Sequence, residues 1–279
     1  MKSHLNWLGG KSHLLDKILP FPKHRVYCDM FGGGGSLLLG KTPCSKEIYN
    51  DVNSRLVNHW KVLRKSWREM KRLAETDIDS RELFFEYQDV HEDKIEDAYR
   101  FFYVNRHSFS SIGLTYQGIT FTDSCKNTYR NTFLKNLDRI EKIHDRIKLV
   151  KFENQDFDTL FKRFYKRSDT EDTLFYLDPP YYHRGNEYER TTTGVEWTQD
   201  SYEKILSWML KFKNAKFVLS IDNVELFEDN GWDIQEIERH NWAGTANGSV
   251  SKAIEYVVRN FDPETTEIMK TEEFNACEF

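Results

Sequence analysis

Short apolar runs alternate along the chain with longer stretches in which apolar residues recur at helical spacing. Short runs bounded by glycine or polar residues are typical of strands, and a period near 3.6 residues is typical of helices. Strands are predicted at 26–31, 47–50, 147–152, 172–177, 216–220, 232–238 and 253–259. Helices are predicted over 12–19, from residue 37, from 54, over 92–104, over 131–147 and over 198–213. This alternation predicts an α/β fold whose last two strands form a hairpin across residues 242–249.

The segment from Ser54 to Arg146 is predicted to be mostly helical. Its recurring apolar residues, interpreted as core rather than as a binding face, are Leu56, Trp60, Leu63 and Trp67. The polar stretch 105–132 is longer than an ordinary connection, so we expect it to be functional or disordered. We therefore predict an inserted helical domain at 54–146. The remaining predicted parts are a discontinuous domain at 1–53 and 147–261 and an acidic tail at 262–279 that frays.

Composition narrows the class of protein. The 279 residues are 39% hydrophobic and 15% aromatic, enough for a large core. No apolar run approaches the roughly 20 residues of a membrane span, and the amino-terminal residues resemble no signal segment. The four cysteines are far apart and lack metal-ligand spacing, so we expect reduced thiols, no metal site and a cytoplasmic location.

Charge is unevenly distributed. The net charge is −5, and residues 262–279 alone carry six acidic residues and one lysine. Residues 101–150 carry eight Lys or Arg and four Asp or Glu. A cationic stretch in an otherwise neutral chain fits contact with phosphates, although a solvated helix surface explains it equally well.

The sequence Asp178-Pro-Pro-Tyr181 follows the apolar run 172–177. Prolines cannot donate ladder hydrogen bonds, so the predicted buried, parallel strand ends there, at the edge where α/β sheets bind ligands. Asp178 and the Pro179 carbonyl offer acceptors, and Tyr181 offers a flat ring. This set suits a planar heterocycle with an NH₂ group, such as adenine. The alternative is a simple turn, since Asp and Pro are common turn formers.

A glycine turn, Gly32-Gly-Gly-Gly-Ser36, follows the strand at 26–31 and precedes a helix. Such an arrangement lets backbone amides approach a nucleotide, although a tight turn also needs glycine. Asp51 ends the next strand about 20 residues later, where an acid commonly accepts hydrogen bonds from both ribose hydroxyls. The spacing favours a ligand with an unmodified ribose.

Three further features are considered for a role at a ligand site. Gly10-Lys11-Ser12 is not a P-loop, because Leu5 stands where that motif needs glycine. Asp156 is another acid near a strand end. The polar connection 183–197 is interpreted as a mobile lid.

Three motifs occur in one order: Asn6-Trp-Leu-Gly-Gly-Lys11, Asp29-Met-Phe-Gly-Gly-Gly-Gly35 and Asp178-Pro-Pro-Tyr181. Together they resemble the DNA adenine methyltransferase (Dam) family, which methylates N6 of adenine in DNA with S-adenosylmethionine. Residues 101–111 resemble that family's target-recognition domain. The resemblance implies a Rossmann-like class I methyltransferase fold, with a mostly parallel seven-stranded sheet and an antiparallel last strand. It covers nearly the whole chain except the tail.

The resemblance also implies roles for single residues. The implied cofactor-binding residues are Trp7, Lys11, Phe31, Gly32, Gly33, Gly34, Gly35, Ser36, Asp51, Asp156 and Asp178. The implied catalytic residues are Asp178, Pro179, Pro180 and Tyr181. The candidate DNA-binding residues are Asn105, Arg106, His107, Ser108, Ser110, Ser111, Tyr116, Lys126 and Arg130.

One departure from the family bears on specificity. Relatives that read GATC carry an arginine shortly after the segment matching 107–112, whereas Gly113-Leu-Thr-Tyr116 has none. Arginine is the usual bidentate reader of guanine. We therefore expect a preferred site other than GATC on double-stranded DNA. A partner restriction enzyme, the oligomeric state and a bacterial or virus-infected host cytoplasm as the setting are left open.

Other functions stay open at this point. The same acceptors suit methylation of an RNA adenine or a protein amide. A nicotinamide-dependent dehydrogenase fits the glycine turn and Asp51 but leaves 178–181 unexplained. A catalytically silent DNA-binding relative is the alternative outside the enzymes.

Overall fold

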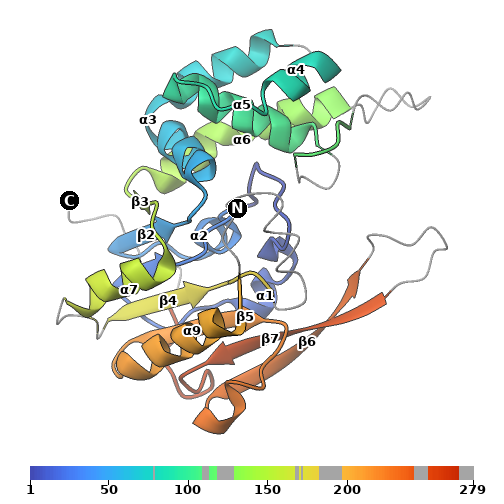
Figure 1. Ribbon diagram of the computed structural model, residues 1–279. Helices are drawn as coiled ribbons and strands as arrows, with labels where there is room; N and C mark the ends of the chain where they lie inside the picture. Colours follow the sequence, from blue (N-terminus) through green and yellow to red (C-terminus); the bar gives the residue numbers. More distant parts are fainter. Residues whose placement is uncertain are drawn as a thin grey trace. The chain divides into compact units, whose positions relative to one another are not determined.

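The computed structural model describes residues 1–77, 79–108, 113–117, 129–166, 170, 172–181, 197–241 and 251–269 (Figure 1). The chain divides into two compact units. The first unit comprises 1–19, 32–41 and 47–155, and the second comprises 20–31, 42–46 and 156–279. In chain order the elements are η1 (Lys11–His13), α1 (Leu15–Ile18), β1 (Val26–Asp29), α2 (Ser36–Gly40), β2 (Lys46–Asn50), α3 (Ser54–Thr76), α4 (Arg81–Glu86), α5 (Lys94–Arg106), α6 (Tyr129–Ile147), β3 (Lys151–Glu153), α7 (Phe157–Tyr165), β4 (Thr173–Leu177), α9 (Gln199–Lys211), β5 (Lys216–Ile221), η5 (Glu228–Asn230), β6 (Asp233–Asn241) and β7 (Ser251–Arg259).

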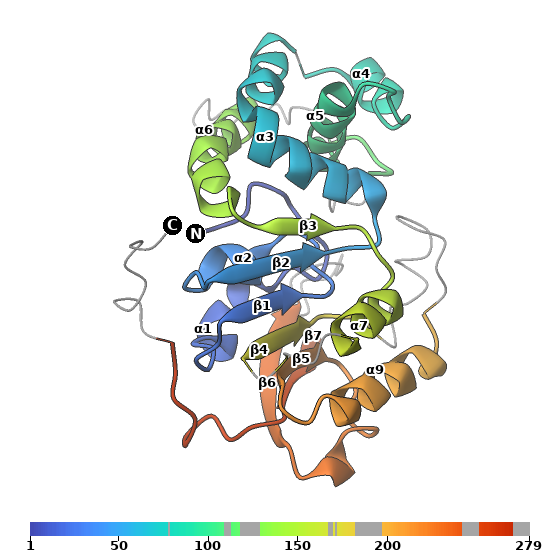
Figure 2. The same cartoon turned by 90° about the vertical axis from the view of Figure 1, so that its left-hand side faces the viewer.

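The strands form a seven-stranded sheet of order β3-β2-β1-β4-β5-β7-β6 (Figure 2). The pairs β2/β3, β1/β4 and β4/β5 are parallel, and β7 is antiparallel to both β5 and β6. The predicted α/β fold, its mostly parallel sheet and its closing hairpin are confirmed. None of the helices in the described ranges is both long and apolar enough to cross a membrane.

Helices α3 to α6 of the first unit lie between β2 and β3 in the sequence, and these two strands are parallel neighbours. Figure 1 shows α3, α5 and α6 lying together. Helix α3 buries Leu56, Trp60, Leu63 and Trp67, as their spacing predicts. The assignment of residues 54–146 to a separate recognition domain stays a prediction.

A buried ionic cluster ties the end of α6 to β2. The Glu47 carboxylate lies 2.5 Å from Lys41 Nζ and accepts two hydrogen bonds from Arg146. Burial alone would raise the pKa of Glu47, but the hydrogen bonds and charges of Arg146 and Lys41 lower it. Arg146 also donates to the Leu38 carbonyl at 2.6 Å. Removing one partner would leave a buried charge uncompensated, so the cluster fixes where the inserted helices return to the sheet.

The second unit has an aromatic core beside β4. All five residues of β4 are buried, because the strand has parallel neighbours on both sides. Phe175 of β4 and Phe217 of β5 stack at 5.1 Å, and Phe161 of α7 lies 5.3 Å from Phe175. Phe161 also stacks on Trp208 of α9, and Figure 2 shows α7 and α9 side by side. This core fixes the end of β4 from which Asp178 emerges.

Several sequence expectations were wrong in detail. Ile147 ends α6 instead of opening a strand, since its side chain is the last buried position of the helix and β3 begins only at Lys151. The single helix expected over 12–19 is two short turns, η1 and α1. Helices α4 and α7 were not predicted.

The acidic tail is not frayed from its first residue. Within residues 262–269, the Glu267 carbonyl accepts the Lys23 N–H at 2.8 Å, and the Met269 N–H donates to the Phe21 carbonyl at 2.9 Å. The bridge between Pro22 and Ile268 completes this short pairing. Residues 270–279 lie outside the described part of the chain.

Two histidines are buried together in the first unit. The Nε2 atoms of His4 and His59 lie 2.6 Å apart, and the rings stack with centroids at 4.9 Å. His59 also bonds the Ala98 carbonyl through Nδ1 at 2.9 Å. Burial lowers the pKa of His59 to about 4, and burial together with the charge of His59 lowers that of His4. The pair is therefore neutral in the folded protein at neutral pH.

Acidification should destabilise the protein through this pair. Between pH 6.5 and about 4 the unfolded chain binds a proton at residue 59 and the folded chain does not. The free energy of unfolding should fall over this window by about 3 kcal/mol for His59. Urea unfolding at pH 7 and pH 4 measures the change, and His59→Gln should reduce it, whereas the control His91→Gln should not. A wild-type stability that is the same at both pH values would contradict the assignment.

Candidate active site

The glycine loop of the first unit is covered by Trp7. A Cβ at Gly33 would lie 2.5 Å from Trp7 Nε1, and a Cβ at Gly34 would lie 2.8 Å from Trp7 Cβ. Gly33 and Gly35 also have positive φ angles of 48° and 70°. Glycine is therefore required here both by backbone conformation and by the close approach of Trp7. Ser36 follows the loop as the first residue of α2.

Asp51 is bonded directly to this loop. One of its oxygens accepts the Gly33 N–H at 2.9 Å, and the other accepts the Asn53 N–H at 2.8 Å. Burial raises the pKa of Asp51, and hydrogen bonds from Asn53 and Gly33 partly offset the rise. The Val52 N–H is a third main-chain donor to this carboxylate. An ionised carboxylate accepts about four hydrogen bonds, so acceptor capacity remains for a ribose hydroxyl, and the residues present suit a nucleoside cofactor.

The outer side of the loop is fixed by two aromatic side chains. The Gly33 carbonyl accepts hydrogen bonds from the Tyr49 hydroxyl at 2.6 Å and from Trp60 Nε1 at 3.3 Å. A Cβ at Gly32 would lie 2.1 Å from the Tyr49 ring. Any side chain at Gly32 would therefore displace Tyr49 and with it the loop.

Lys11 lies in the one-turn helix η1 and is buried, with its ammonium donating to the Gly9 carbonyl at 3.0 Å. The segment before it is a turn closed by the hydrogen bond from Gly10 N–H to the Trp7 carbonyl at 3.0 Å. Trp7, the glycine loop and Asp51 are thus brought together within the first unit, and Lys11 is joined to Trp7 through this turn.

In the second unit, Asp178-Pro-Pro-Tyr181 directly follows the buried strand β4. The carbonyl of Pro180 accepts the Tyr202 hydroxyl of α9 at 2.5 Å. Among the residues that the structure describes, none donates a hydrogen bond to the Pro179 carbonyl. A ligand-binding role for the Pro179 carbonyl stays a prediction.

Tyr181 is held by a buried acid. Its hydroxyl donates to Glu255 Oε1, and the Glu255 side chain is 0% exposed on β7. Burial, the charges of Asp178 and Glu255, and the hydrogen bond to Glu255 raise the pKa of Tyr181 far above its ordinary value. Tyr181 therefore stays neutral near pH 7, and the residue is buried.

Phe31, a predicted cofactor-binding residue of this unit, lies among aromatic side chains. The Phe31 ring lies 5.6 Å from Phe157 and 5.5 Å from Trp197, and Trp197 meets Tyr202 edge-on at 5.7 Å. Asp156 is exposed and caps α7, accepting the N–H groups of Asp158 and Thr159. Phe31 thus contacts the first residue of α7, the helix that Asp156 caps.

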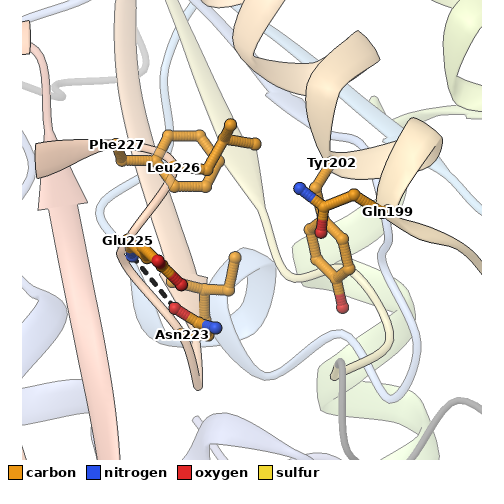
Figure 3. A pocket seen from close by; sticks show the side chains of 7 residues that line it. Gln199, Tyr202, Asn223, Glu225, Leu226 and Phe227 are labelled. Atoms are coloured by element: carbon orange, nitrogen blue, oxygen red, sulfur yellow. Dashed lines mark hydrogen bonds between the residues drawn. The ribbon is translucent and has the colours of Figure 1, made fainter. Parts of the chain in front are cut away.

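A pocket of about 410 Å³ lies beside Tyr202 (Figure 3). It is lined by Gln199, Tyr202, Ile221, Asn223, Glu225, Leu226 and Phe227. Figure 3 shows Gln199 and Tyr202 on one side and Asn223 and Glu225 on the other, with the Asn223 side chain bonded to the Glu225 N–H at 2.9 Å. Apolar walls with amide and carboxylate groups can accommodate a nucleobase.

The candidate DNA-binding residues differ in accessibility. Asn105, Arg106, His107 and Ser108 are buried. Tyr116 donates its hydroxyl to Asp79 at 2.6 Å, and the Arg81 guanidinium lies 5.1 Å from its ring centre. Ser110, Ser111 and Lys126, the side chain of Arg130, and the lid expected at 183–196 lie outside the described residues. Contact with DNA stays a prediction for all of these residues.

We call the first-unit residues around the glycine loop and Asp51 the cofactor half-site, and the second-unit residues around Asp178-Pro-Pro-Tyr181 the second half-site. Sequence reasoning did not single out five residues at the two half-sites as functional: Tyr49, Phe157, Trp197, Tyr202 and Glu255. Each contacts a predicted residue, yet their partners are as many as 74 positions away. No local pattern could have identified such pairs. Phe157 alone had a nearby signal, because it directly follows Asp156.

Residues 7–241 match the sequence pattern of the family described as D12 class N6 adenine-specific DNA methyltransferase. The chain belongs to this family.

Two curated relatives are similar to the chain. Modification methylase StsI of Streptococcus sanguinis is 24% identical over 97% of this chain and 44% of its own length. The type II methyltransferase M1.LlaDCHI of Lactococcus lactis subsp. cremoris is 24% identical over 94% of this chain and 96% of its own length. The chain thus spans less than half of the first relative and nearly all of the second.

A solved structure of a precorrin-8W decarboxylase from Methanobacterium thermoautotrophicum matches with a TM-score of 0.38 and 10% identity. The match covers 90% of this chain and 89% of that chain. So low a similarity decides neither fold nor chemistry.

The Tyr181–Glu255 hydrogen bond should matter for turnover. Tyr181→Phe removes the donor and keeps the ring, and Glu255→Gln keeps the shape of the acceptor side chain but removes its charge. Each should lower kcat about tenfold, and the double variant should be no worse than either one, because residues that act through one contact are not additive.

Methyl-transfer kinetics at saturating substrate measure this cycle, with Glu236→Gln on the neighbouring strand β6 as the control. Additive losses in the double variant would show that the two side chains act independently.

Proposed function

We propose that this chain transfers a methyl group from S-adenosylmethionine to N6 of an adenine in double-stranded DNA. The observation that carries the proposal is the Pro179 carbonyl, left without a donor among the described residues beside Asp178 at the end of β4. Membership of the family supports the same reaction. The dehydrogenase alternative is set aside, because it leaves residues 178–181 without a role.

Asp178 and the Pro179 carbonyl provide the electrostatic part of the proposed chemistry. The N6 lone pair of adenine is delocalised into the ring, which makes the nitrogen a poor nucleophile. Two acceptors on its hydrogens favour sp³ geometry and stabilise the positive charge that grows during attack. The proton leaves after the bond has formed, so no general base is needed, in keeping with a neutral Tyr181.

The remaining residues hold the reactants. Bound S-adenosylmethionine supplies an electrophilic methyl group. We infer that Asp51 holds its ribose, that the glycine loop and Trp7 accommodate the methionine part, and that Asp156 lies near its adenine. The target adenine has to leave the duplex, because paired N6 cannot align with the methyl group. It then stacks on Tyr181, whereas the pocket beside Tyr202 is lined by other residues.

Labelled-methyl transfer to unmethylated genomic DNA tests the function. We expect N6-methyladenine on nucleoside analysis of wild-type reactions and a loss of at least a thousandfold in Asp178→Ala with DNA binding largely kept. Asp172→Ala, at the other end of the same strand, is the matched control and should transfer normally.

Labelling of RNA or protein but not of DNA would favour the alternative substrates with the same acceptors. Binding of DNA without any transfer by the wild-type protein would leave the silent DNA-binding relative as the better description.

Specificity is a separate prediction. Because 113–116 lacks the arginine found in relatives that read GATC, we propose a different preferred sequence. Mapping methylated motifs in DNA exposed to the enzyme should show one short motif other than GATC. A map dominated by GATC would refute the prediction and leave the reaction class intact.

A further inference from the structure

The side chain of Asn105 is paired with the main chain of Asn6. Asn105 Oδ1 accepts the Asn6 N–H at 3.0 Å, and Asn105 Nδ2 donates to the Asn6 carbonyl at 2.6 Å. One amide group thus satisfies both backbone groups of a residue 99 positions away, as a neighbouring strand would. Such a two-bond pairing fixes the position and the direction of the chain at residue 6.

Arg106 reinforces this pairing from the next position. Its guanidinium donates to Asn6 Oδ1. The side chains of Asn105 and Arg106 are only 4% and 6% exposed. Their polar groups are directed at Asn6, which is a poor arrangement for contacting DNA phosphates. We call Asn6, Asn105 and Arg106 the asparagine clasp.

The clasp is next to the cofactor half-site of the first unit. Trp7 directly follows Asn6, and its ring and Cβ lie against Gly33 and Gly34. Gly33 in turn donates its N–H to Asp51. A shift of the chain at residue 6 would therefore move Trp7 relative to the loop that Asp51 holds.

The other side of the clasp continues into the recognition stretch. Asn105 and Arg106 are the last two residues of α5, and His107 caps its end. The His107 carbonyl accepts the Gln117 N–H at 2.7 Å, and Ser108 Oγ accepts the Gly113 N–H at 2.7 Å. The end of α5 is thus bonded both to residues 113–117 and to Asn6.

We propose that Asn105 is a positioning residue that places Trp7 for cofactor binding and couples the recognition stretch to the cofactor loop. This inference rests on the proposed cofactor but not on the identity of the substrate. A residue at this place would set the affinity for S-adenosylmethionine without touching it. DNA that moves the end of α5 would change that affinity through the same contacts.

The test compares Asn105→Ala and Asn105→Asp with Asn58→Ala. The aspartate keeps an acceptor for the Asn6 N–H but places a second oxygen against the Asn6 carbonyl. The control residue Asn58 also makes two hydrogen bonds between helices of this unit, to the Lys94 carbonyl and to Asp97, but does not contact Asn6.

Three quantities are measured: the Kd for S-adenosylmethionine by calorimetry without and with DNA, the Kd for DNA without cofactor, and hydrogen exchange at residues 6–12. We expect the cofactor Kd to rise about tenfold in both Asn105 variants, the change that DNA makes to it to shrink, and exchange at 6–12 to increase. DNA affinity without cofactor should stay within twofold, and Asn58→Ala should resemble wild type.

A weaker DNA Kd with an unchanged cofactor Kd would overturn the inference, because it would make Asn105 a DNA contact. Equal losses of cofactor affinity in all three variants, or failure of both Asn105 variants to fold, would show that the clasp is only a general stabilising contact. If wild type binds no S-adenosylmethionine, the proposed function fails. If wild type binds S-adenosylmethionine and Asn105→Ala binds it equally well, only the inference about Asn105 fails.

Discussion

The main-chain groups of Gly33 are the constraint on which the candidate cofactor half-site depends. The N–H of Gly33 is bonded to Asp51, and its carbonyl is bonded to Tyr49 and Trp60. The two peptide units that flank the Gly33 Cα are therefore both held by the protein, and the loop cannot rotate there without breaking hydrogen bonds. Buried backbone groups that lose their partners cost free energy, so the loop is held in place before any ligand arrives. The positive φ of Gly33 adds a steric reason for the residue type.

The half-site of the second unit depends on the antiparallel direction of the last strand, β7. Strand β7 is antiparallel to β5, and it carries Glu255 to the tyrosine that ends the strand-end tetrapeptide. The aromatic core beneath β4 and the hydroxyl of Tyr202 fix the same segment from the helical side. A short peptide with two prolines is thus held at the Pro180 carbonyl and at the Tyr181 hydroxyl. Catalysis by placement of acceptors needs this kind of rigidity.

Sequence patterns predicted the strands, the inserted helices and the closing hairpin, because burial imposes periods that are visible locally. The end of α6 at Ile147 was predicted correctly, but the next strand was expected to begin at the same residue, whereas β3 begins only at Lys151. Helix α7 shows the spacing expected of a buried helix at Phe157, Leu160, Phe161 and Phe164, so its signal was present. The contacts of Glu255 and of Asn105 could not be predicted, because single polar residues in strands and helices look alike whether they face solvent or a partner 74 or 99 positions away.

The helices α3 to α6 are themselves the connection between two adjacent parallel strands, β2 and β3. Parallel strands need a crossover connection, and here that connection is the segment predicted to read DNA. Its two ends are fixed at opposite ends of this strand pair, since Asn50 at the end of β2 is level with Glu153 and Lys151 at the start of β3 is level with Ile48. A replacement segment from a relative would therefore have to meet three geometric conditions: both strand ends, the Glu47 cluster at the end of α6, and an amide matching Asn105. Grafting of the segment predicted to read DNA therefore depends on meeting these three conditions rather than on the length of the segment.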